Sequence, residues 1–385
     1  MSKIYEIDPD ADTVVTVRPL VEGFAPWPAE DHDKSSAASS SLLRPTTDVR
    51  IKASAKHLSL ASSRFRDILA QAVTAASPLQ TSYKPLIASL DNNDTKPNSL
   101  WRKETAPPSP PLSDYGGSSP SQTSEADGRI HVVLEGLDAD AVITVLNIVH
   151  GRGGKDRVPK AISLEALARI AVVIDKFKLQ HAVDIYADRW VDALGHPSAR
   201  NSPRELTLWI YIAYVFQHDN IFQEATKLAA VQLTGPLPAL ANLPLRAKIV
   251  RDLDAQRQAV IEGALQIIRD TINTLIVDED IGDGEDQKGV INSDTFLLGA
   301  LLRTLHRQKV FWPHLAAPYT GISVTAITSA AHDVQTQAWQ MAFRLGDLTR
   351  YNKSNNALRL TPQLDTLRAR AAGLQLRSEL GYNLY

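Results

Sequence analysis

The stretch Asp48–Leu69, DVRIKASAKHLSLASSRFRDIL, carries the clearest structural signal in this 385-residue chain. Its first part, residues 48–53, places apolar side chains at every second position, which is the pattern of a half-buried strand. A helical turn is predicted at His57–Leu60, and Ser62 is placed to cap the helix that follows. The apolar side of that helix carries Phe65, Ile68 and Leu69. The stretch therefore predicts a small strand-turn-helix unit.

The segments before and after this unit predict a small sheet interrupted by two insertions. Residues 13–18 form a β-branched run that can pair with 48–53 as a hairpin, with the Ser- and Pro-containing segment 22–47 as its long loop. A second insertion is predicted at 75–128, where residues 105–124 hold five Pro, six Ser and two Thr. Such compositions bury too little apolar surface to offset the entropy of ordering, so we expect both insertions to be disordered.

Order is predicted to return at Arg129, where RIHVVLEG alternates as a strand. Asp138 and Ser163 are placed as caps of the next two helices, and another helix is expected at about 181–194. From Pro203 onward only helices are predicted. The longest, at about 245–276, has an apolar stripe that favours packing on the domain over binding a partner.

The composition is that of an ordinary globular protein with balanced charge. Lys and Arg number 41 against 43 Asp and Glu, which does not favour direct nucleic-acid binding. The absence of cysteine excludes disulfides, thiolate metal sites and a cysteine nucleophile. No signal-peptide run or membrane-length apolar stretch is present. We therefore expect an intracellular protein, cytoplasmic or nuclear or both, without membrane contact.

No motif in the chain predicts catalysis, a metal or a cofactor. Asp8, Asp10 and Asp12 have the spacing that opens a calcium-binding loop, but that loop's glycine and closing acidic residue are missing, so a turn is expected. The acidic segment 278–286 fails the same test. The histidines are dispersed, and His150 is expected to stabilise the carbonyl groups at a helix end.

The second insertion offers the only candidate regulatory motifs. Residues 107–111, PPSPP, form a short PxxP-type stretch that suits recognition by a polyproline-binding domain. Ser109 and Ser119 each precede a proline and are candidate sites for proline-directed kinases. Both motifs are common in loops of this composition. A regulatory role is therefore one hypothesis, and a disordered insertion without such a role is the other.

The combination of these elements resembles a BTB/POZ domain, in the divergent form found in fungal proteins. The segments that carry the resemblance are residues 8–17, 48–65, 129–141, 162–179 and 184–194, together with the helix that ends in NIVHG at 147–151. The signature positions within the strand-turn-helix unit, which determine the fold and are candidates for an interface, are Asp48, Val49, His57, Leu58, Ser62 and Phe65. The later helical segments resemble the helical tail of the same proteins.

The resemblance implies an α+β fold in which a small sheet lies beside a helical bundle, followed by an all-α extension. It places the BTB/POZ-like domain at 8–194, with its insertions, and the extension at 195–385. It also implies a non-enzymatic scaffold that binds a second copy of itself or other proteins. Two alternatives stay open: a substrate adaptor that binds a cullin in a ubiquitin ligase, and a transcriptional co-factor that acts through partners.

Overall fold

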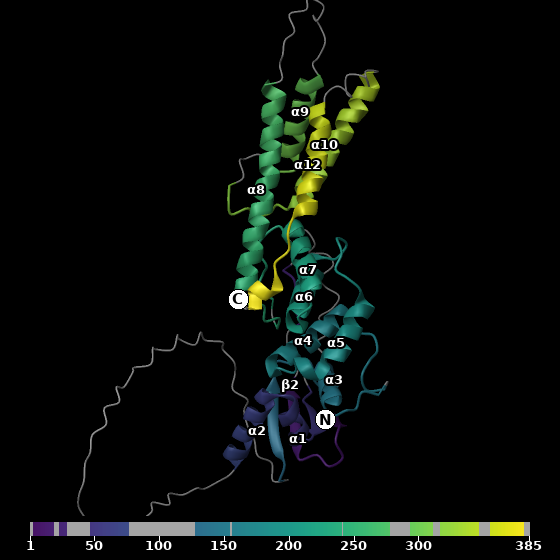
Figure 1. Ribbon diagram of the computed structural model, residues 1–385, viewed down its shortest axis with the longest axis vertical. Coiled ribbons are helices and arrows are strands. Elements are labelled where there is room, and N and C mark those ends of the chain that lie inside the picture. The colour runs from purple at the N-terminus through teal and green to yellow at the C-terminus, as the bar shows by residue number, and fades with distance from the viewer. Residues whose placement is uncertain are drawn as a thin grey trace, which may run out of the picture.

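The computed structural model is elongated, with a small sheet at one end and a layer of long helices at the other (Figure 1). The structure describes residues 3–18, 23–28, 47–76, 128–154, 156–240, 242–277, 293–310, 316–345 and 355–380.

The sheet has four strands in the order β1-β3-β2-β4. They are β1 (Lys3–Glu6), β2 (Thr13–Arg18), β3 (Val49–Ala53) and β4 (Ile130–Glu135). β2 and β3 pair antiparallel, which confirms the predicted hairpin, while β4 runs parallel to β2. Val15 lies opposite both Ile51 and Val132, and all three side chains are buried. The mixture of this sheet with many helices confirms the α+β class.

The edge strand β1 was not predicted. Its four residues, KIYE, pair in parallel with β3, but they are mostly exposed, and Ile4 keeps 61% of its surface accessible. A strand this short with one exposed edge has too few alternating side chains to give a periodic signal. Its position depends on the neighbouring strand β3, which supplies its hydrogen-bonding partner.

Seven helices pack with the sheet around the first hydrophobic core. They are α1 (Ala55–Ala61), α2 (Ser63–Ala76), α3 (Ala139–Val149), α4 (Leu164–Phe177), α5 (Gln180–Leu194), α6 (Pro203–Phe216) and α7 (Asp219–Gln232). The predicted caps are present, because Asp138 accepts from the Ala141 amide at 2.9 Å and Ser163 from the Ala166 amide at 3.2 Å. α1 is longer than the single turn predicted for it.

Helix α6 lies in the middle of this core. Every side chain from Leu206 to Val215 is buried. The first core therefore continues past residue 194 through α6 and α7 to Ile249 and Leu253 in the following helix. The division into domains at residue 194 stays a prediction, while the hydrophobic packing is continuous across that position.

A second hydrophobic core is built by α8 (Ala247–Val277), α9 (Ser293–Arg307), α10 (Val324–Leu345) and α12 (Asn355–Arg370). The 31-residue helix α8 joins the two cores, since its Ile249 lies in the first and its Ile268 in the second. Its apolar stripe therefore packs on the protein. The short helix α13 (Leu376–Leu380) returns to the first core, where Glu379 pairs with Lys248 at 2.9 Å.

The prediction of a flexible linker at 22–47 is wrong for residues 23–28. Phe24 and Ala25 are buried in the first core, and their carbonyl groups accept hydrogen bonds from Arg204 at 3.0 and 2.8 Å. The sequence did not predict this buried pair, Phe24 and Ala25, because the residue that holds it, Arg204, lies far along the chain. The described residues do not include residues 22 and 29–46 of that insertion, residues 77–127 of the second insertion, or the acidic segment 278–286.

Candidate functional site

The signature positions of the strand-turn-helix unit divide into buried and accessible groups. Leu58, Ser62 and Phe65 are buried, so they determine the fold rather than form a surface. Val49 is half-buried within β3, and His57 is exposed on α1. Asp48 and Arg18 form a surface ion pair at 3.9 Å. Of these positions, His57 is therefore the most accessible to a ligand or partner.

Ser62 connects helix α2 to helix α4. Its oxygen accepts a hydrogen bond from the Phe65 amide at 3.0 Å, which confirms the predicted cap. The same hydroxyl donates to the carbonyl oxygen of Phe177 at the end of α4. The Ser62 amide ends α1 by donating to the Leu58 carbonyl at 3.1 Å, while the Ser62 hydroxyl begins α2 and fixes this junction to the next layer of the core.

His150 connects the end of α3 to the junction between β3 and α1. Its Nδ1 lies 2.7 Å from the Leu146 carbonyl oxygen, which confirms that it stabilises the helix end, and its Nε2 accepts from the Ser54 amide at 3.0 Å. These partners require the proton on Nδ1 and a lone pair on Nε2. Burial lowers the pKa of His150; the Leu146 carbonyl raises it less, and nearby His57 lowers it further.

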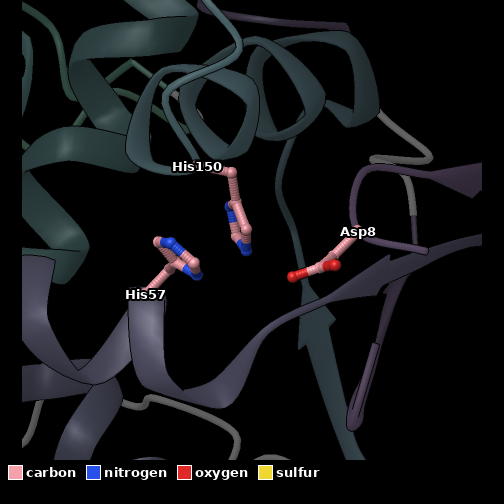
Figure 2. A group of neighbouring side chains, drawn as sticks. All are labelled: Asp8, His57 and His150. Carbon is pink, nitrogen blue, oxygen red and sulfur yellow. The ribbon is translucent and has the colours of Figure 1, made fainter. Parts of the chain in front are cut away.

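Asp8 completes a small cluster with these two histidines. Figure 2 shows the Asp8 carboxylate and the rings of His57 and His150 directed toward one space. Their potential ligand atoms all lie within 4.8 Å of one another, and the two rings have centroids 5.0 Å apart. Sequence reasoning missed this cluster, because its members are widely separated in the chain and only the packing of α1 on α3 brings them together.

The acidic run that contains Asp8 is a turn, as predicted. Asp8 Oδ1 accepts from the Asp10 amide at 3.1 Å, and Asp12 Oδ1 accepts from the Ala55 amide at 2.7 Å. Asp12 therefore holds the start of α1 instead of sharing a ligand with Asp8. Among the three aspartates, Asp8 is the one that takes part in the histidine cluster.

A groove of about 500 Å³ lies between α3 and α4. Three of its charged side chains are engaged with one another: Arg169 binds Asp138 at 2.9 Å and Glu165 at 2.5 Å, and Glu165 also accepts from Arg204 at 2.8 Å. Partial burial acts to raise the pKa of Glu165, but the hydrogen bonds and charges of Arg204 and Arg169 outweigh it and hold that pKa below its usual value. These ion pairs connect the start of α3, helix α4 and helix α6, and they therefore hold the three helices in position.

Large apolar side chains are exposed on the first elements of the sheet end. Ile4 on β1 and Leu60 on α1 keep 61% and 73% of their surface accessible, and Val73 on α2 is also exposed. Figure 1 places these elements together at the end of the molecule opposite the second core. This end also carries the outer edge of β1, whose neighbour on its inner side is β3.

Several predicted sites lie outside the described residues. They are Ser109, Ser119, the PxxP stretch 107–111 and the acidic segment 278–286. Their assignments as phosphorylation sites, a polyproline ligand and a solvated loop stay predictions.

Comparisons with known proteins identify no relative. No family model, no curated protein and no solved structure matches this chain. Across the described residues, every helix is too short or too polar to cross a lipid bilayer.

Proposed function

We propose that this chain is a non-enzymatic protein–protein interaction module of the BTB/POZ type. Its long helices form an extension of that module, and the whole chain acts as a scaffold. The order of elements supports this proposal. A hairpin, β2–β3, is followed by the two short helices α1 and α2, then by the parallel strand β4 and the helices α3 to α5. This is the order that the sequence resemblance implies for a small sheet beside a helical bundle.

The observation that carries the proposal is the pair of exposed apolar side chains Ile4 and Leu60 at the sheet end. Ile4 lies on β1 and Leu60 on α1, and both elements adjoin β3, because β1 pairs with β3 and β3 leads into α1. Exposed apolar groups beside a sheet edge favour burial against another protein, and the edge strand has backbone groups directed away from the sheet for strand addition. The proposed partner-binding surface is therefore β1 and α1.

Self-association of the purified chain tests this surface. We expect sedimentation velocity to show a dimer at micromolar concentration and a shift toward monomer in Leu60→Asp. Ile185→Asp is the matched control, since Ile185 is equally exposed but lies on α5. Equal association of wild type and Leu60→Asp, with equal recovery of cellular partners, would contradict a role for this surface.

The adaptor alternative is favoured by a different observation, the presence of two separate cores joined by α8. An adaptor needs one surface for the ligase and another for its substrate. A groove of about 440 Å³ on α8 and α12, with Ile267, Arg359 and Arg370 in its lining, provides a second surface far from the sheet. Co-purification with a cullin would support this function, and its reproducible absence from an otherwise specific set of partners would exclude it.

A further inference from the structure

The cluster of Asp8, His57 and His150 combines side chains from three different elements. Asp8 lies in the turn between β1 and β2, His57 on α1 and His150 at the end of α3. A set of two imidazoles and one carboxylate is a common ligand set for transition-metal ions, and a cluster assembled from distant parts of the chain has to be positioned by the fold. The contacts around each side chain show how it would act as a ligand.

His150 already has the orientation of a metal ligand. Its Nδ1–H donates to the Leu146 carbonyl at 2.7 Å, and a backbone carbonyl in this role fixes the tautomer and ring orientation of metal-bound histidines. The edge of the ring that carries Nε2 faces Asp8 and His57 (Figure 2). Nε2 now accepts from the Ser54 amide at 3.0 Å, and Ser54 is only partly buried, so water can bind that amide when the ring binds an ion.

The other two side chains have the freedom to complete the site. His57 is exposed and Asp8 is half-buried. Asp8 Oδ1 holds the Asp10 amide, so Oδ2 is the oxygen that an ion would use. Zinc–ligand distances of about 2.0–2.2 Å place tetrahedral ligand atoms about 3.4 Å apart. The present separations of up to 4.8 Å exceed that value, so ion binding requires the two more accessible side chains, Asp8 and His57, to rotate toward His150.

We propose that Asp8, His57 and His150 bind one Zn²⁺ ion, with water in the fourth position. Zn²⁺ suits this set because it prefers imidazole nitrogen and accepts carboxylate oxygen, whereas Mg²⁺ and Ca²⁺ prefer all-oxygen sites. The ion joins the β1–β2 turn to α1 and α3, and it thereby fixes the edge strand against the core. The site is independent of the proposed function, because it depends only on these three side chains.

Isothermal titration calorimetry of the untagged full chain with ZnCl₂ near neutral pH tests the site. We expect one ion per chain for the wild type and a loss of affinity of more than about tenfold in His57→Ala and in Asp8→Asn. His57 is exposed, so His57→Ala should keep its circular dichroism spectrum and melting temperature. His181→Ala is the matched control, since His181 is an exposed histidine on α5, and it should bind like the wild type.

A second measurement distinguishes a built site from weak surface binding. Zinc should raise the melting temperature of the wild type and of His181→Ala but leave that of His57→Ala unchanged, since binding to the folded state alone stabilises it. Co²⁺ should give the visible absorption of a tetrahedral complex in the wild type and lose it in Asp8→Asn. Equal zinc affinity in all variants, or no saturable binding by the wild type, would overturn the proposal and leave His150 as a structural link.

Discussion

Phe65 of α2 and Phe177 of α4 stack with their ring centroids 4.2 Å apart and their planes inclined by 12°. Both rings are fully buried, and the Ser62 hydroxyl spans the same contact by binding the Phe65 amide and the Phe177 carbonyl. The strand-turn-helix unit is therefore attached to the helical bundle by a stacked ring pair and a bridging hydroxyl.

Replacing Phe65 by alanine should destabilise the protein by about 3–5 kcal/mol, because it leaves a cavity beneath α2 and removes the stacked ring. Urea unfolding followed by circular dichroism measures the change. Leu60→Ala, one helix earlier and exposed, should stay within about 0.5 kcal/mol of the wild type. An unchanged melting temperature for Phe65→Ala would mean that α2 does not pack on α4.

Replacing Ser62 by alanine should cost about 2–3 kcal/mol, from the loss of the α2 cap and of the donor to the buried Phe177 carbonyl. The neighbouring Ser63 is exposed, so Ser63→Ala is the matched control and should have little effect. Equal melting temperatures for the two variants would show that the hydroxyl contributes nothing to stability.

Much of this end of the molecule was predictable because its signals are local. A β-branched run identified β2 and alternation identified β3 and β4, while the caps at Ser62, Asp138 and Ser163 each depend on a backbone amide three residues away. β1 and the anchor at Phe24 were missed, since each is held by a distant partner: β3 for the strand and Arg204 for the carbonyl of Phe24. Long-range contacts leave no periodic pattern in the sequence.

The difference between local signals and long-range contacts also explains why the candidate metal site was not predicted. The hydrogen bond of His150 to Leu146 spans one helical turn and was expected, whereas the Ser54 amide that it also accepts from lies elsewhere in the sequence. Asp8 and His57 join it only after the β1–β2 turn and α1 have packed beside α3. No spacing rule connects the three residues, so only the folded structure shows them together.

Arg257 provides a test of the junction between the two cores. It is fully buried on α8, and its Nε donates to Asp254 at 2.9 Å. Asp254→Ala should cost about 3 kcal/mol, because it leaves a buried cation without its counter-charge, and adding Arg257→Met should restore most of the loss. Asp252→Ala, at an exposed ion pair on the same helix, is the control. A larger loss of stability in the double variant than in Asp254→Ala alone would contradict the idea that the unpaired Arg257 cation causes the loss.

The ion pairs of Glu165 predict a pH dependence of stability. Arg204 and Arg169 hold its pKa below the ordinary value, so its contribution is present above the unfolded-state pKa and is lost as pH falls through the folded-state pKa. Glu165→Gln should therefore lower stability near neutral pH by less than about 1 kcal/mol, since the group is partly exposed, and match the wild type in acid. Denaturation midpoints of the wild type and Glu165→Gln, measured from neutral to acid pH, test this prediction. Glu224→Gln on α7 is the control. A difference in stability between Glu165→Gln and the wild type that stays constant with pH would contradict a contribution from the Glu165 ion pairs.

Quantitative affinity purification of the tagged full chain from its native cells tests whether the sheet end binds other proteins. We expect a reproducible set of partners, including the chain itself or a cullin, that is depleted for Leu60→Asp and retained for Ile185→Asp. Recovery of the same proteins in the same amounts by Leu60→Asp, or of no protein above the untagged control, would contradict this expectation.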